Sequence, residues 1–329
     1  MNDIVVSDEY NKIREEIKLL MQEMAALLME RDELLYHICP ELRAKYAKEI
    51  GDYQARAMYQ ELMILELKRR IEITRAALNR EQVISEEEVD EQVKEEYKEF
   101  HKKVDEEYKK TENAKEEYKS KEEKTKEYRK QWEEKYGDRY DNANDETRGS
   151  NESNEKKDDD SVSKKKKPPT LKELYRKIVK KLHPDVNPNA TEREKELLNK
   201  ASTAYEEGDM VTLQEIYDEI FGDSKTEDIL SDENISIEQL IKLKLQLALR
   251  IKELLAEVEA IMADFPYNQK KFLDDPEALK EEQDKIKAKI KKYEQEIQRL
   301  TEILEEVNKQ LEELREKKRR RSNGRKRKI

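Results

Sequence analysis

Apolar side chains recur at alternating intervals of three and four residues along most of this 329-residue chain. That spacing puts them on one face of an α-helix and, when it persists over several heptads, predicts a coiled coil. Charged residues make up 45% of the chain and glycine occupies only 6 positions, so neither a large apolar core nor a β-rich fold is expected. We therefore predict an all-α protein dominated by long coiled-coil helices.

The pattern is cleanest in residues 236–316, which we expect to form a C-terminal coiled-coil hairpin. Ser236 can cap a first helix that ends before FPYNQKKFLDDP, the predicted turn. Asp275-Pro276 then supplies an N-cap and a proline at the first helical position. The second seam is Leu279, Gln283, Ile286, Ile290, Tyr293, Ile297, Leu300, Leu304, Val307, Leu311 and Leu314. Spacing alone leaves open whether its partner is the preceding helix, another copy of the chain, or both.

The N-terminal region, residues 1–136, carries the same spacing in two successive seams. The first runs over residues 10–38 and stops before Pro40, which lacks an amide donor and disfavours a helical residue before it. The second runs over residues 46–78. Because the connection around Pro40 is short, the two helices are predicted to fold back as an antiparallel hairpin.

A third N-terminal helix and two linkers follow. Ser85 and Glu88 have capping-box spacing and begin the helix, but its apolar positions become sparse after Tyr108, so its last part is expected as a solvated single helix. Residues 137–168 lack both periodicity and large apolar side chains, which predicts a disordered polar linker. Residues 222–235 are predicted as a second, acidic linker.

A compact helical module is predicted between these linkers, over residues 169–221. The run LKELYRKIVKKL, from Leu171, is amphipathic and leads directly into His183-Pro184-Asp185. Pro184 ends the helix and opens a loop. Thr191 and Glu194 have capping-box spacing for a second helix, Gly208 stops it, and Asp209 can start a third.

This module resembles the J-domain (DnaJ) family. In that family a helical hairpin holds a His-Pro-Asp loop between its second and third helices. The segment LYRKIVKKLHPDVNP is similar to the family's second helix and loop, and NKASTAY is similar to its third helix, with Tyr205 where a core aromatic is usual. The resemblance covers about 50 residues, and the tripeptide is specific because of the helices on either side of it.

The resemblance implies a co-chaperone or adaptor that binds a DnaK-type heat-shock chaperone and stimulates its ATPase. A row of cations suits electrostatic steering to an acidic surface, and a loop carboxylate can pair with a partner's arginine. The coiled coils would then self-associate or hold a client protein. The expected partner-binding residues are His183, Pro184, Asp185, Lys172, Tyr175, Arg176, Lys177, Lys180 and Lys181.

Departures from the family pattern keep a second hypothesis open. The segment SVSKKKKPPT cannot form the family's first helix, and Val186 follows the loop instead of the usual lysine. The alternative is therefore a non-catalytic coiled-coil scaffold with a degenerate J-like module. The basic tail, residues 317–329, could in either case bind nucleic acid or another polyanion without sequence preference.

The sequence argues against a metal site, an enzyme active site and a membrane-spanning segment. His37, Cys39 and His101 have no further His or Cys near them in the sequence at the spacing of a metal site, so no metal or other cofactor is expected. No phosphate-binding loop or nucleophile–base pair is present, and we do not expect an enzyme. No apolar run approaches the roughly 20 residues that span a bilayer. A single cysteine and no visible secretory signal favour a cytoplasmic protein.

Overall fold

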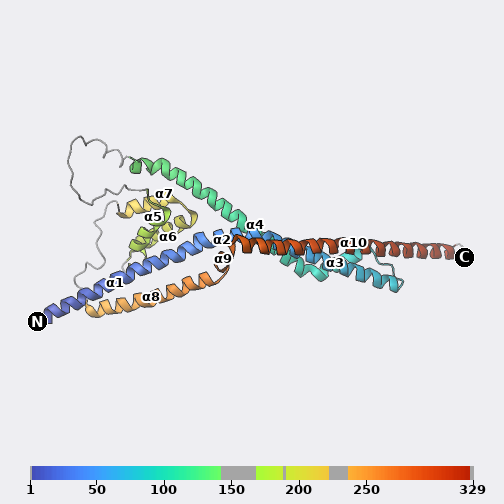
Figure 1. The fold of residues 1–329 in the computed structure, drawn as a ribbon, viewed down its shortest axis with the longest axis horizontal. Helices are drawn as coiled ribbons and strands as arrows, with labels where there is room; N and C mark the ends of the chain where they lie inside the picture. Colours follow the sequence, from blue (N-terminus) through green and yellow to red (C-terminus); the bar gives the residue numbers. More distant parts are fainter. Residues whose placement is uncertain (1, 142–167, 188–189, 222–235, 327–329) are drawn as a thin grey trace. The chain divides into compact units, whose positions relative to one another are not determined.

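The computed structural model describes residues 2–141, 168–187, 190–221 and 236–326 (Figure 1). These residues form helices and contain no strand, which confirms the predicted all-α class. The predicted acidic linker over residues 222–235 and most of the predicted polar linker over residues 137–168 lie outside the described residues.

The helices follow one another in the order expected from the capping signals. The N-terminal segments are α1 (Asn2–Glu33), a π-helical segment (Leu34–Ile38), α2 (Cys39–Tyr46), a second π-helical segment (Ala47–Gly51), α3 (Asp52–Asn79) and α4 (Glu86–Asp141). The central helices are α5 (Leu171–Leu182), α6 (Glu192–Glu207) and α7 (Met210–Phe221). The C-terminal segments are α8 (Ile237–Ala263), a 3₁₀ turn (Tyr267–Gln269), α9 (Lys270–Leu273) and α10 (Pro276–Lys326).

The predicted hairpin at Pro40 is wrong, because the helical segments continue through this proline without a turn. In an α-helix the amide of residue 40 would donate to the carbonyl of Tyr36, and proline has no such donor. Lys121 of α4 replaces it: its ammonium group donates to the Tyr36 carbonyl oxygen. The π-helical segment Leu34–Ile38 precedes the proline and changes the helical hydrogen-bond pattern there.

Two compact units make up the chain. The first consists of Met1–Glu41 and Glu117–Asn268, and the second of Leu42–Glu116 and Gln269–Ile329. Each unit is built on a pair of long helices that are distant in sequence.

In the first unit, α8 packs alongside α1 (Figure 1). Lys244 Nζ lies 2.6 Å from a carboxylate oxygen of Glu16, and Arg31 lies 3.6 Å from Glu257. Residue numbers therefore increase together along both helices, so the pair is parallel. The apolar seam of α8 that the sequence predicted is the face that contacts α1, including the buried residues Leu240, Leu247, Ile251 and Leu254.

In the second unit, α10 packs alongside α3 in the same parallel sense. Lys45 lies 2.9 Å from Asp274 and Arg56 lies 2.7 Å from Glu294. Farther along, Ile64, Ile71 and Leu300 form a buried cluster. Both C-terminal helices thus pair with segments of the N-terminal helix, a partner that the periodicity did not suggest. Helices α8 and α10 belong to different units, so the predicted hairpin between them stays a prediction.

Helix α4 contributes to both units. In the second unit, Arg69 of α3 makes a two-pronged ion pair with Glu96. In the first unit, Trp132 is only 3% exposed and belongs to the main hydrophobic core. The end of α4 was expected to be a solvated single helix, and that expectation is wrong here, because Trp132 is buried in the core and Lys135 pairs with Glu215 of α7.

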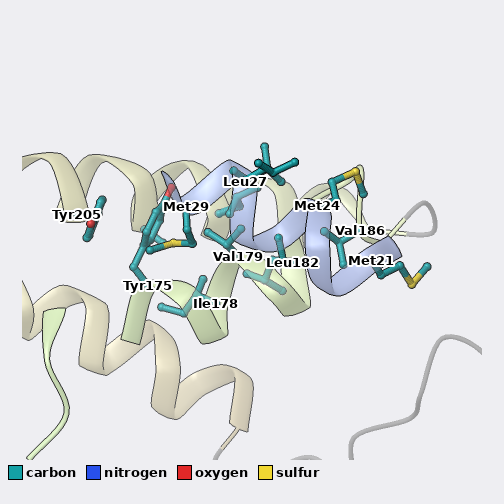
Figure 2. Close-up of a cluster of buried hydrophobic side chains, with 14 of the residues drawn as sticks. Met21, Met24, Leu27, Met29, Tyr175, Ile178, Val179, Leu182, Val186 and Tyr205 are labelled. Atoms are coloured by element: carbon teal, nitrogen blue, oxygen red, sulfur yellow. The ribbon is translucent and has the colours of Figure 1, made fainter. Parts of the chain in front are cut away.

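The central module is a bundle of α5, α6 and α7 that shares one core with α1. Apolar residues of α1 lie against α5 and the loop after it (Figure 2). From α1, Figure 2 labels Met21, Met24, Leu27 and Met29. From the module, it labels Tyr175, Ile178, Val179, Leu182 and Val186 of α5 and the loop. Burying one such side chain contributes about 1.5–3 kcal/mol. Helix α1 therefore covers the hairpin together with α7.

Candidate partner-binding site

The His-Pro-Asp loop forms because two capping signals define the hairpin on either side of it. Thr170 and Glu173 make a reciprocal capping box at the start of α5, and Thr191 and Glu194 make another at the start of α6. Helix α5 is capped at its end by His183, whose carbonyl oxygen accepts hydrogen bonds from the amides of Val186 and Asn187 at 2.9 and 2.6 Å. The loop is thus tied back to the helix end.

Tyr175 lies in the core of this hairpin, although it was predicted as a partner-binding residue. It is 1% exposed, and its ring stacks on that of Tyr205 with centroids 4.2 Å apart. Its hydroxyl donates to Asp32 Oδ2 of α1 at 2.8 Å and lies 3.0 Å from Ser202 Oγ. Burial raises the pKa of the Tyr175 hydroxyl well above its ordinary value, so it stays protonated as a donor. Tyr175 positions α5 and is not available to a partner.

His183 is half-buried beside the loop. Its Nδ1 accepts a hydrogen bond from the amide of Asp185 at 3.1 Å, which requires that nitrogen to be unprotonated. Burial is also the main reason that the pKa of His183 is lowered, although the nearby Asp185 carboxylate acts in the opposite direction. The imidazole is therefore neutral, with its proton on Nε2. Pro184, between these two residues, is exposed.

Asp185 does not point freely into solvent. Its Oδ2 accepts from Arg250 Nε of α8 at 2.9 Å. The same guanidinium lies 3.4 Å from Glu257, and Glu257 lies 3.6 Å from Arg31. The hydrogen bond to Asp185 is the main reason that the pKa of Arg250 is raised.

Arg31 and Tyr175 complete this network inside the first unit. Arg31 donates to Asp32 at 2.8 Å, and Asp32 accepts from Tyr175. A continuous series of charged and polar groups thus joins the His-Pro-Asp loop to the core hydroxyl of α5. Arg31, Asp32 and Arg250 were missed by sequence reasoning, because each is one charge among many on a charged helix.

The cations of α5 fall into two groups. Lys172 pairs with Glu33 of α1, and Lys177 lies over the ring of Tyr217 at 5.1 Å. Arg176, Lys180 and Lys181 make no ion pair with any residue in the described ranges, and the first two are exposed. Of the cations predicted to bind a partner, these three remain unpaired among the described residues, next to the exposed Pro184.

A cavity of about 330 Å³ lies elsewhere in the first unit, between α4 and the π-helical segment Leu34–Ile38 with the start of α2. Tyr36, His37, Tyr118 and Lys121 line it. Burial lowers the pKa of His37 to about 4, and its ring meets Tyr205 edge-on at 4.5 Å. Lys121 is engaged by the Tyr36 carbonyl, so these polar groups hold the helices together.

The remaining candidate groups have structural partners. His101 Nε2 lies 2.7 Å from Glu66, and Cys39 is buried. In the part of the chain that is described, no three His, Cys, Asp or Glu side chains are grouped to hold a metal ion. The predicted basic tail begins within α10, where Lys318 donates to the Glu81 carbonyl, and its residues 327–329 are not among those described.

Comparisons with known proteins do not assign the chain to a family. No protein-family model matches the chain, and neither a curated protein nor a solved structure matches it. Among the described residues, no helix combines the length and the apolar character needed to cross a membrane.

Proposed function

We propose that this chain is a J-domain-like co-chaperone or adaptor of the cytoplasm, which binds a DnaK-type heat-shock chaperone and stimulates its ATPase. One observation carries the proposal: the His-Pro-Asp loop stands at the end of a cationic helix, in a packed antiparallel hairpin. Arg176 and Lys180 are exposed on that helix, and Pro184 is exposed in the loop. The chain itself binds no nucleotide in this proposal.

The proposed contact works in two steps. Exposed cations on α5 first attract the acidic surface of the chaperone, which accelerates encounter without fixing its geometry. The loop then offers the Asp185 carboxylate to an arginine of the chaperone, a strong charge-assisted pair. Because Arg250 already holds this carboxylate, the chaperone's arginine has to displace it. A client would be carried by the long helix pairs outside the module.

Steady-state ATP turnover by a DnaK-type chaperone from the same host tests the proposal. We expect the wild-type chain to accelerate turnover and His183→Gln to abolish the effect. His101→Gln is the matched control, since it makes the same chemical change on α4 in the second unit. A wild-type chain that accelerates no DnaK-type chaperone of its host contradicts the proposal.

A second candidate is a scaffold in which the module only holds α1, α4 and α8 together. The burial of Tyr175 and the pairing of Asp185 with Arg250 favour it, because both residues already serve the chain's own packing. This hypothesis predicts that wild type and His183→Gln behave alike in every partner assay. Chaperone binding that is unchanged by His183→Gln would support the scaffold over the co-chaperone.

A further inference from the structure

Helix α10 continues beyond the end of its own apolar seam. After Leu311 and Leu314, the same spacing of four and three residues leads to Lys318, Arg321 and Arg325. A helix needs an apolar face to pack against another helix. The last turns of α10, which belong to the basic tail, therefore have no seam with which to join a helix pair.

Two hydrogen bonds mark the place where α10 extends past its partner in the second unit. Helix α3 ends at Asn79, and the connection to α4 follows. In this connection the carbonyl of Ile84 accepts from Arg315, and the carbonyl of Glu81 accepts from Lys318. Beyond Lys318, helix α10 continues for about two turns past the end of α3 (Figure 1).

This extension is strongly cationic. Nine of the twelve residues 317–328 are lysine or arginine and none is acidic, although the chain as a whole has a net charge of −11. The side chains of residues 317–321 are exposed. Three of these five make no ion pair with any described residue: Lys317, Arg319 and Arg321. The segment therefore offers positive charge that the chain itself does not neutralise.

The cations surround the helix instead of lying on one face. Successive residues of an α-helix point in directions about 100° apart, so five consecutive cations cover its whole circumference. Like charges four residues apart, such as those of Lys317 and Arg321, destabilise a helix. A polyanion would remove this repulsion. Cations on every side suit one that presents negative charge on both sides of the helix.

We propose that the basic tail binds duplex DNA by lying in the major groove, through contacts with phosphates. This groove is about 12 Å wide, admits an α-helix and has a phosphate backbone on either side. The helical part of the tail, residues 317–326, is about 15 Å long at 1.5 Å per residue, which is enough to cross the groove. Phosphate contacts carry no sequence information, so binding should not depend on the base sequence.

Other polyanions fit the segment less well. Proteins hold single-stranded nucleic acid largely by stacking its bases on aromatic side chains, and residues 317–328 contain none. A helix that lies in a membrane surface needs an apolar face opposite its cations, and this segment has no apolar face. The inference is independent of the co-chaperone proposal, because the basic tail and the loop at Asp185 belong to different units.

Fluorescence anisotropy of a labelled short DNA duplex, titrated with the full chain, tests the contact. We expect glutamine at all three unpaired cations of the tail to weaken binding at least about tenfold at 50 mM salt. The matched control replaces three exposed lysines of α10 outside the tail by glutamine: Lys291, Lys292 and Lys309. It changes the net charge equally and should bind within about twofold of wild type. A wild type that does not bind, or equal losses in the two variants, overturns the proposal. Circular dichroism checks that both variants stay folded.

Salt dependence and competing ligands test the kind of polyanion. Three phosphate contacts alone predict that affinity for the duplex falls about fortyfold between 50 and 200 mM salt, and the glutamine variant should lose this part of the dependence. Single-stranded DNA of the same length and vesicles of anionic phospholipid are the alternative ligands. Binding to either of them as tight as to the duplex overturns the assignment to duplex DNA.

A variant that keeps the charges tests whether the contacts are purely electrostatic. Lys317→Arg with Arg319→Lys and Arg321→Lys preserves every charge of the unpaired set and should bind the duplex like wild type. Its binding should also be equal for duplexes of unrelated sequence. A loss of affinity in this variant, or a preference for one sequence, would overturn binding through phosphates alone.

Discussion

Arg250 holds Asp185: its Nε lies 2.9 Å from Oδ2, so that a residue of α8 neutralises the carboxylate of the His-Pro-Asp loop. The two side chains are 34% and 31% exposed, and each is reachable by a partner. The carboxylate that the co-chaperone proposal assigns to a chaperone's arginine is therefore already engaged within the chain. Any partner competes with this ion pair.

Replacing Arg250 with alanine should strengthen chaperone binding. A partly exposed pair contributes up to about 1 kcal/mol, so the dissociation constant should fall about twofold to fivefold. Calorimetry or surface plasmon resonance with a DnaK-type chaperone measures this change. Arg250→Lys is the control, because it keeps the charge, and should lie between wild type and Arg250→Ala. Weaker binding by Arg250→Ala would mean that the Arg250–Asp185 ion pair holds the loop in the conformation that binds the chaperone, and does not compete with the chaperone for the carboxylate.

Lys121→Met should destabilise the first unit. It removes a charged donor to the Tyr36 carbonyl, and a hydrogen bond to a charged group contributes about 1.5–3 kcal/mol. Urea unfolding followed by circular dichroism measures the free energy of unfolding. Lys124→Met, at an exposed position of the same helix, should have little effect.

Pro40 is the reason why the Tyr36 carbonyl lacks its usual backbone donor, and replacing this proline allows a stricter test of the role of Lys121. In a Pro40→Ala background the backbone has an amide that can donate to the Tyr36 carbonyl. The loss caused by Lys121→Met should then be smaller than in wild type, and a double-mutant cycle measures the difference. Equal losses in the two backgrounds would show that Lys121 does not compensate for the proline.

Tyr175→Phe should lower the free energy of unfolding by about 1–3 kcal/mol. The ring and its stacking on Tyr205 are kept, while Asp32 loses a buried donor. Tyr217→Phe is the control, since the Tyr217 hydroxyl makes no hydrogen bond with a described residue. If Tyr175 instead bound the chaperone directly, Tyr175→Phe would weaken binding without changing stability.

Stability should decrease as the pH falls from about 6.5 towards 4. The pKa of His37 is lowered from 6.5 to about 4, so between these values the unfolded chain binds more protons than the folded one. The neutral ring is favoured at pH 7, and about 1–2 kcal/mol of stability should be lost by pH 5. His183, whose pKa is also lowered, acts in the same direction.

Urea unfolding at pH 7.5 and at pH 5 measures this dependence. His37→Gln should have a flatter profile over this interval, whatever its stability at pH 7.5, because it has no proton to gain. An unchanged slope in His37→Gln would contradict the assignment of the effect to His37.

Local signals in the sequence were sufficient to predict most of the helices and several of their starts, with the interruption at Pro40 as the exception. Thr191 with Glu194, Ser236, and Asp275 with Pro276 each begin a helix where predicted, and Gly208 ends α6 with φ +76°. These features depend on residues within one or two turns, so the chain specifies them without reference to its fold. The position of the His-Pro-Asp loop follows from the same signals.

The tertiary structure decided which helices pair and which side chains remain available. A heptad seam shows that a helix has a partner but not which one, because many apolar seams fit one another. Pro40 stays inside a helix because Lys121, distant in sequence, supplies the missing donor. Asp185 is paired because the parallel packing of α8 on α1 brings Arg250 to the loop. Such contacts depend on register between distant segments, which periodicity within one segment does not encode.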